Sequence, residues 1–161
     1  MASALYTPTR RKPVPPRKKG ATWCVPYAIA TASLLRSYEA AEDAIREVIP
    51  EYQKPLRWER EMGYRSKPIK GVFMASTVRV MSALGLVMVP KSVSRKLTLT
   101  QWYKQRGDKK GFYIVSAGRH VQLVHGTMIC DNCSDGWVSF NQHRRYKRAR
   151  IKSVYQIYAK R

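Results

Sequence analysis

The sequence predicts an α+β fold, with helices in the first two thirds of the chain and a meander of antiparallel strands after them. Before residue 85, apolar residues recur at the three- and four-residue spacing of amphipathic helices. From Gly111 onward, short runs of β-branched and aromatic residues alternate with glycine turns. The 161 residues, 44% of them hydrophobic, are enough for one domain with its own core.

Helices are expected at 21–38, 39–49, 71–84 and 100–105. Thr22 is the predicted N-cap of the first helix, and Pro26 lies in its first turn, where a missing N–H is harmless. Either Thr98 or Thr100 would cap the last helix. Residues 51–70 are expected to form a long loop with one helical turn near 56–61. This loop would be a lid over Cys24 or a partner site.

Strands are expected at 86–90, 112–117, 120–125, 127–130, 137–140 and 151–158. Gly118, Gly126 and the 132–136 segment supply the turns between the middle strands. In the last segment, 151–158, alternate side chains fall into two sets, as on the two faces of a strand. The segment is therefore predicted to be a closing strand. Helices packed on such an antiparallel meander or half-barrel would complete the domain at 21–161.

The net charge of +21 is concentrated at the two ends of the chain. Residues 1–20 are rich in proline and form a predicted basic tail, and residues 141–161 form a basic C-terminal segment without acids. Such ends attract polyanions through counterion release, which predicts binding to DNA or RNA, or to a virion protein surface. The predicted contacts are Arg10, Arg11, Lys12, Arg17, Lys18, Lys19, Arg144, Arg145, Lys147, Arg148 and Arg150.

Cys24, His120 and Asp131 are the candidate catalytic residues. A helix N-terminus stabilises a thiolate, and Cys24 stands near the start of the first predicted helix. A histidine can take the thiol proton and return it to a leaving group, and a carboxylate behind it fixes the tautomer. A hairpin of the strands around 120–125 and 127–130 would bring His120 and Asp131 together. Asn132 competes for the orienting role, and His125 competes as the base.

These segments resemble papain-like cysteine peptidases, in particular small papain-like proteins of tailed bacteriophages. The resemblance rests on the Cys-Val-Pro-Tyr-Ala-Ile-Ala segment at 24–30, on the strand–Gly–His–strand pattern at 112–121, on the turn–strand–Asp pattern at 126–131, and on the Leu-Thr-Leu-Thr-Gln-Trp segment at 97–102. It implies a papain-like fold and a cysteine peptidase or amide hydrolase of phage or viral origin. It also implies a protein or peptide substrate, no cofactor, and a place in the host cytoplasm or the virion.

The chain departs from the papain-like pattern at the oxyanion hole. Such enzymes place a Gln shortly before the cysteine, whereas Lys18 stands six residues before Cys24 and no Gln precedes Gln53. The Cys24 backbone N–H would then be one oxyanion donor, with Thr22 and Lys19 as candidates for the second. Losing one such donor costs about 10²–10³ in rate. The alternative function is therefore an inactive papain-like scaffold that binds nucleic acid or a virion protein.

Other residues that could bind a metal or a base have simpler interpretations. The pair Cys130 and Cys133, with His125 and His143 nearby, could suggest zinc, but only one such pair exists and no metal is predicted. The odd number of cysteines argues against a disulfide framework. Tyr146, Tyr155 and Tyr158 would stack on bases or, more simply, pack in the sheet. No apolar run approaches the roughly 18 residues of a membrane span, and the N-terminus has no apolar signal core.

Overall fold

The computed structural model describes residues 13–160 and has the predicted α+β architecture. The helices are α1 (Cys24–Ala32), α2 (Tyr38–Val48), the short 3-10 helix η1 (Pro50–Tyr52), α3 (Arg57–Glu61), α4 (Met74–Ala83) and α5 (Leu99–Gln105). The strands are β1 (Leu86–Lys91), β2 (Phe112–Ala117), β3 (His120–His125), β4 (Met128–Cys130), β5 (Val138–Ser139) and β6 (Ile151–Ala159). No helix of the described part is long and apolar enough to cross a membrane.

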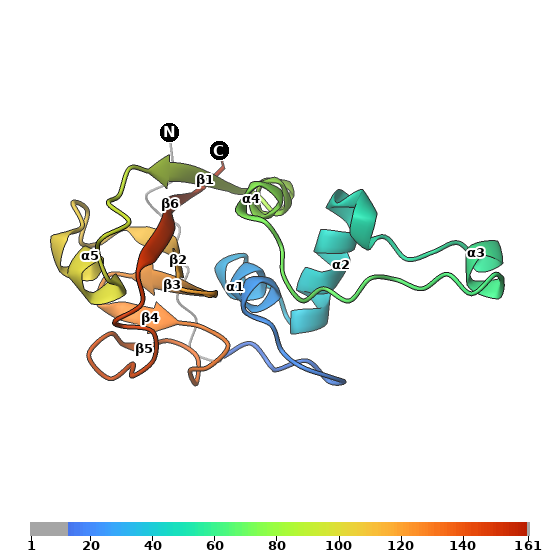
Figure 1. The fold of residues 1–161 in the computed structure, drawn as a ribbon, viewed down its shortest axis with the longest axis horizontal. Helices are drawn as coiled ribbons and strands as arrows, with labels where there is room; N and C mark the ends of the chain where they lie inside the picture. The colour runs from blue at the N-terminus through green and yellow to red at the C-terminus, as the bar shows by residue number, and fades with distance from the viewer. Residues whose placement is uncertain (1–12, 161) are drawn as a thin grey trace.

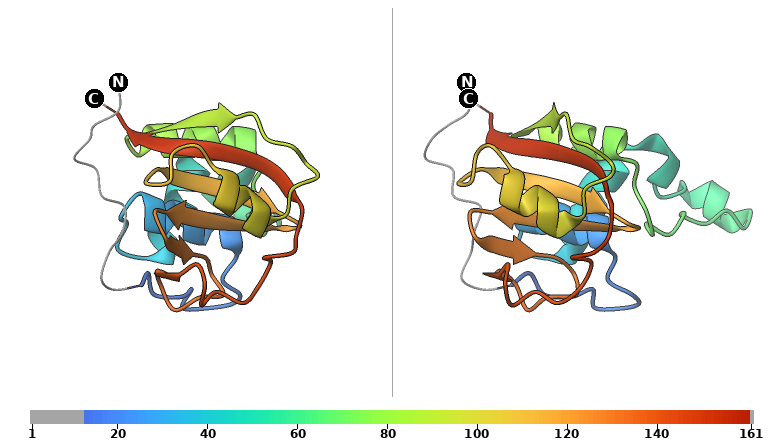
Figure 2. Two further views of the ribbon diagram at one scale, coloured as in Figure 1. Left: turned by 90° about the vertical axis from the view of Figure 1, so that its left-hand side faces the viewer. Right: turned by 60° about the vertical axis from the view of Figure 1, so that its left-hand side comes forward.

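All six strands form one open antiparallel sheet in the order β1-β6-β2-β3-β4-β5. Strands β2 to β5 are the predicted meander, and β6 returns to lie between β1 and β2, as Figure 2 shows. Helices α1, α2 and α4 lie on one side of the sheet and α5 lies on the other (Figure 1). The middle strands are therefore buried on both faces, which explains why they are almost continuously apolar.

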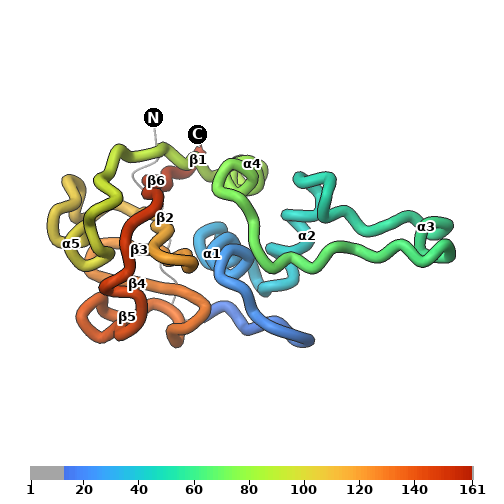
Figure 3. Tube along the Cα trace, viewed as in Figure 1, coloured from blue at the N-terminus to red at the C-terminus, as the bar shows by residue number. Residues whose placement is uncertain are grey.

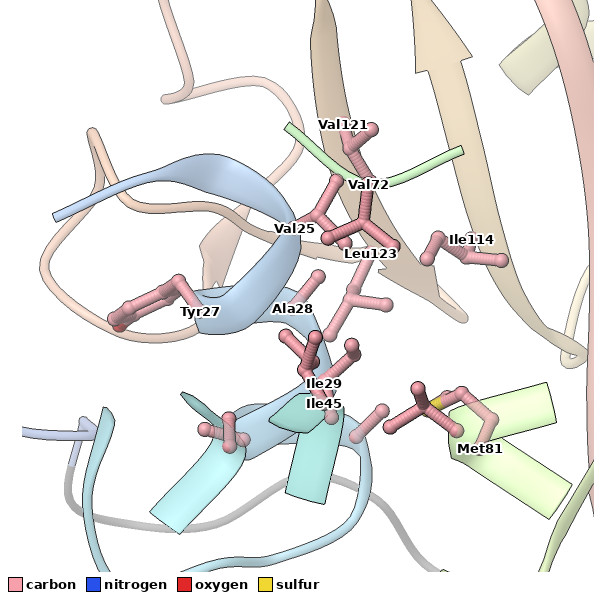
Figure 4. Close-up of a cluster of buried hydrophobic side chains, with 14 of the residues drawn as sticks. Val25, Tyr27, Ala28, Ile29, Ile45, Val72, Met81, Ile114, Val121 and Leu123 are labelled. Carbon is pink, nitrogen blue, oxygen red and sulfur yellow. The ribbon is translucent and has the colours of Figure 1, made fainter. Parts of the chain in front are cut away.

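The larger core lies between the sheet and the three helices, and α1 is at its centre (Figure 4). Ile29 on α1, Ile45 on α2 and Met81 on α4 are completely buried there. Ile114 and Leu123 face this core from β2 and β3. The smaller core under α5 contains their neighbours Tyr113, Val115 and Val124. Burying one such side chain contributes about 1.5–3 kcal/mol, so α1 is held firmly against β3.

The first helix is shorter than predicted. It ends at Ala32, and Leu34 then takes a left-handed φ of 55°, which stops the helix before residue 38. Thr22 is not its N-cap, because that position is Trp23, which makes no side-chain cap. The Thr22 hydroxyl instead accepts a hydrogen bond from the Arg17 backbone N–H. Pro26 does lie in the first turn, as predicted.

The predicted basic tail is partly folded onto the domain. Val14 is only 3% exposed and belongs to the main core. Arg17 forms an ion pair with Glu42 at 3.0 Å, and the Lys18 N–H donates to Glu39 at 2.7 Å. Arg17 and Lys18 therefore attach this segment to α2, while Pro13 lies close to Gly136 in the loop between β4 and β5. Arg10, Arg11 and Lys12 lie outside the described residues.

Residues 53–70 form an arm that projects from the body and carries α3 at its far end (Figures 1 and 3). At its base, the Tyr52 hydroxyl donates to the Gly71 carbonyl at 2.6 Å. Large apolar side chains are exposed on the arm, with Trp58 at 58% and Met62 at 73%. The arm points away from α1, so it is not the lid over Cys24 that the sequence left open.

Candidate active site

Cys24 is the first residue of α1, at the end of the helix where backbone N–H groups are unpaired. The preceding Trp23 is extended and its N–H donates to the Tyr38 hydroxyl at 3.0 Å. This bond ties the start of α1 to the start of α2, and the buried face of α1 fixes the rest. The thiol is consequently held at one place beside the start of β3, where α1 packs.

The thiol of Cys24 interacts with the imidazole of His120, the first residue of β3. Burial raises the pKa of the Cys24 thiol, but hydrogen bonding to His120, the positive charge of that imidazole and a hydrogen bond from the Val121 backbone outweigh it. The net pKa of the thiol is lowered from its usual 9.0. This is the behaviour expected of an activated nucleophile rather than of a cysteine that only fills space.

Asp131 accepts a hydrogen bond from His120, as predicted, with 3.0 Å between His120 Nε2 and Asp131 Oδ2. Antiparallel pairing of β3 with β4 brings them together, because Asp131 follows the last residue of β4 directly. Since Nε2 of His120 faces the carboxylate, Nδ1 is the ring nitrogen left for the thiol. Burial lowers the pKa of His120, but its hydrogen bonds to Asp131 and Cys24 and their charges raise it to about 9.

His143 is a second imidazole on the same carboxylate, which the sequence did not predict. Its Nε2 lies 2.9 Å from Asp131 Oδ2, the same oxygen that faces His120. The other carboxylate oxygen accepts the Cys133 backbone N–H at 2.9 Å. Burial raises the pKa of Asp131, but the two histidines hold it well below its usual range. Asp131 is thus an ionised, fully paired buried carboxylate.

Tyr146 covers one face of the His120 imidazole. Its ring is stacked on the His120 imidazole, with centroids 4.1 Å apart and an angle of 11° between the planes. Tyr146 has a left-handed φ of 62°, which is unusual for a bulky residue and turns the chain back over the site. His143 and Tyr146 both belong to the loop between β5 and β6. No periodicity or motif marked this loop, so the only sequence signal was the presence of a histidine and a tyrosine within it.

The two alternative site residues lie elsewhere. Asn132 does not orient His120, because its side-chain amide donates to the Thr22 carbonyl at 2.9 Å. It thereby ties the loop after β4 to the segment before α1. His125 is at the far end of β3 from His120, packed against the rings of Phe112 and Trp137, and burial lowers its pKa. It is half-buried and lies away from the Cys24 thiol's partner His120.

Of the three predicted oxyanion groups, the Cys24 backbone is the best placed. The Cys24 N–H stands at the start of α1, and it is among the groups that lower the pKa of the thiol. The Thr22 hydroxyl accepts from Arg17, but its own hydrogen is still available for donation. Lys19 is exposed in the segment before α1. Thr22 and Lys19 therefore both stay predicted candidates for the second oxyanion donor.

The two cysteines of the C-x₂-C pair lie in different environments. Cys130 is buried, and burial raises its pKa to about 12, whereas Cys133 is exposed. The donor atoms of His120, Asp131 and Cys133 lie within 4.8 Å of one another and could approach a cation. Two of these three groups are already hydrogen-bonded to each other, so their arrangement is accounted for without a metal.

The predicted polyanion contacts divide into engaged and free groups. Arg17 is paired with Glu42, Arg150 donates to the Lys96 carbonyl, and Lys147 lies over the Phe140 ring at 5.0 Å. Arg144, Arg145 and Arg148 are exposed and, within residues 13–160, form no ion pair. Tyr155 and Tyr158 belong to β6, in line with the simpler interpretation. Lys18 and Lys19, in the segment before α1, are also exposed and form no ion pair within residues 13–160. The three free arginines lie on the loop that also carries His143 and Tyr146.

Comparisons with protein-family models, with curated proteins and with solved structures found no match to this chain.

Proposed function

We propose that this protein is a papain-like cysteine peptidase or amide hydrolase of phage or viral origin. The observation that carries the proposal is the contact chain from Cys24 through His120 to Asp131, with a lowered thiol pKa at one end and a buried carboxylate at the other. A cysteine at the start of a helix that packs on an antiparallel sheet also agrees with the resemblance to papain-like proteins.

The proposed reaction begins with attack of the Cys24 thiolate on an amide carbonyl, which forms a tetrahedral oxyanion. The Cys24 backbone N–H, with Thr22 or Lys19, would stabilise this charge. Protonated His120 then gives its proton to the leaving amine, and a thioester remains on Cys24. Water, deprotonated by His120, hydrolyses the thioester and regenerates the thiolate. Asp131 holds the imidazole in orientation and stabilises its positive charge throughout.

Selective alkylation tests this proposal without knowledge of the substrate. Iodoacetamide at neutral pH should modify Cys24 well before Cys130 or Cys133, and the His120→Ala variant should lose that selectivity, as peptide mapping by mass spectrometry would reveal. Cleavage of a peptide library should fall by roughly 10⁴-fold or more in Cys24→Ala. A Cys130→Ser variant is the matched control. If Cys24 reacts no faster than Cys133, the peptidase proposal fails.

A non-catalytic scaffold that binds nucleic acid is the second candidate, favoured by the net charge of +21 and by the free arginines near residue 145. Binding to a single-stranded oligonucleotide should then weaken steeply with salt. Removal of residues 1–12 together with neutralisation of Arg144, Arg145 and Arg148 should abolish it. Undiminished binding by that variant would exclude this role for the predicted basic ends. The two functions are compatible in a virion-associated peptidase that stays close to the genome.

A further inference from the structure

We infer that Arg144 and Arg145 form an anion-binding subsite beside the candidate active site, and that it receives a carboxylate side chain of an acidic peptide substrate. This inference rests on the proposed function and names its substrate class.

The two arginines are fixed next to the catalytic residues by the residues on either side of them. His143 is anchored to Asp131 through its Nε2 at 2.9 Å, and Tyr146 is anchored to His120 by ring stacking at 4.1 Å. Arg144 and Arg145 are the only residues between these two anchors. Their backbone therefore cannot leave the neighbourhood of His120 while the site is intact, although their own side chains remain exposed.

A hollow of about 220 Å³ lies beside this loop, lined by residues that include Cys133, Ser134, Asp135, His143, Arg144 and Arg145. It reaches the catalytic residues at Cys133, whose sulfur is within 4.8 Å of donor atoms of His120 and Asp131. Its volume suits one or two side chains of a bound peptide. In this role a bound peptide extends from His120 past Cys133 to the hollow.

The charges of the hollow favour an anion. Arg144 and Arg145 make no ion pair within residues 13–160, and Asp135 is the one acid among the residues that line the hollow. Arginine presents a planar fork of N–H donors that matches a carboxylate in two-point contact. A nucleic acid would also be attracted, but a thiolate and an imidazole act on carbonyl compounds, so the anion that arrives with the scissile bond is a peptide carboxylate.

Two matched peptide pools test the subsite: fluorescein-labelled peptides of random Glu and Ala, and the same peptides with Gln in place of Glu. The Cys24→Ala variant should bind the Glu pool about tenfold or more tightly than the Gln pool in fluorescence anisotropy, the size expected for a charge-assisted hydrogen bond. Adding Arg144→Gln and Arg145→Gln should bring the ratio close to one. Adding Arg60→Gln and Arg65→Gln on the arm instead removes the same charge far from the site and should preserve the preference.

Equal affinity for the two pools overturns the subsite, as does a preference that survives Arg144→Gln and Arg145→Gln in a variant with unaltered circular dichroism. Peptide binding without charge preference, together with loss of oligonucleotide binding in that variant, would assign the pair to nucleic acid instead. If Cys24→Ala prefers the Glu pool but the unmodified protein cleaves neither pool, the subsite stands and the peptidase proposal falls. Where cleavage occurs, KM for the Glu pool should rise in the double variant while kcat is retained.

Discussion

The ring of Tyr146 lies flat against the imidazole of His120, although the two residues are 26 positions apart and come from a loop and a strand. Aromatic contacts of this kind contribute about 0.5–1.5 kcal/mol beyond the area that they bury. Tyr146→Ala should therefore lower the free energy of unfolding by about 1 kcal/mol, whereas Tyr146→Phe should keep nearly all of it. Urea unfolding of the three proteins measures both values. Equal losses in the two variants would place the stabilisation in the hydroxyl rather than in the stacked ring.

The pH dependence of the proposed reaction should follow the Cys24 and His120 pair. The lowered pKa of Cys24 makes its thiolate available below the ordinary value of 9.0, and the pKa of His120 near 9 keeps the imidazole protonated there. Because the leaving amine needs that proton, kcat/KM should fall on the alkaline side as pH rises through about 9. A fall that begins near the ordinary histidine value of 6.5 would contradict the coupling.

Asp131→Asn should remove both the orientation of His120 and the charge that stabilises it. We expect a loss of roughly 10⁴-fold in kcat and of about 3 kcal/mol or more in stability, because the two buried imidazoles lose the carboxylate oxygen that both contact. Asn132→Ala is the matched neighbour, and it should retain activity within about tenfold, since Asn132 contacts the Thr22 carbonyl and not His120. Similar kinetic losses in the two variants would argue against the separate roles.

The free energy of unfolding should pass through a maximum with pH that is set by Asp131 and His120. Asp131, with its lowered pKa, contributes stability above its ordinary pKa of 3.8 that is lost as pH falls below that value. His120, with its raised pKa, contributes stability that is complete below 6.5 and lost as pH rises through about 9. Urea unfolding across this range should find the plateau between pH 3.8 and 6.5, and Asp131→Asn should flatten the profile.

Removal of His143 should affect the acidic side of that profile alone. In His143→Phe, Asp131 keeps His120 as its one imidazole partner, so its pKa should rise toward the ordinary value. Acid unfolding should then begin at higher pH, whereas the alkaline limit set by His120 should stay near 9. His143→Gln, which retains an N–H donor, should show a smaller displacement. An alkaline limit that moves as far as the acidic one would show that His143 acts on His120 instead of on Asp131.

Much of the fold, and the contact between His120 and Asp131, followed from local patterns. A helix start places Cys24, and the glycine turn between β3 and β4 brings Asp131 back toward His120, so spacing alone predicts their meeting. His143 and Tyr146 reach the same point along an irregular path between β5 and β6, which no period or capping signal describes. Val14 was missed for a similar reason: the prolines correctly exclude a helix, but an extended segment can still place one side chain in the core.

If the proposed peptidase activity is present, the arm at residues 53–70 has a consequence when copies of the protein meet one another. It is an exposed extension, and therefore an accessible stretch for autolysis. The arm carries six lysines and arginines against two glutamates. A subsite built from Arg144 and Arg145 repels such a segment, so the preference for acidic substrates would also protect each molecule from its neighbours.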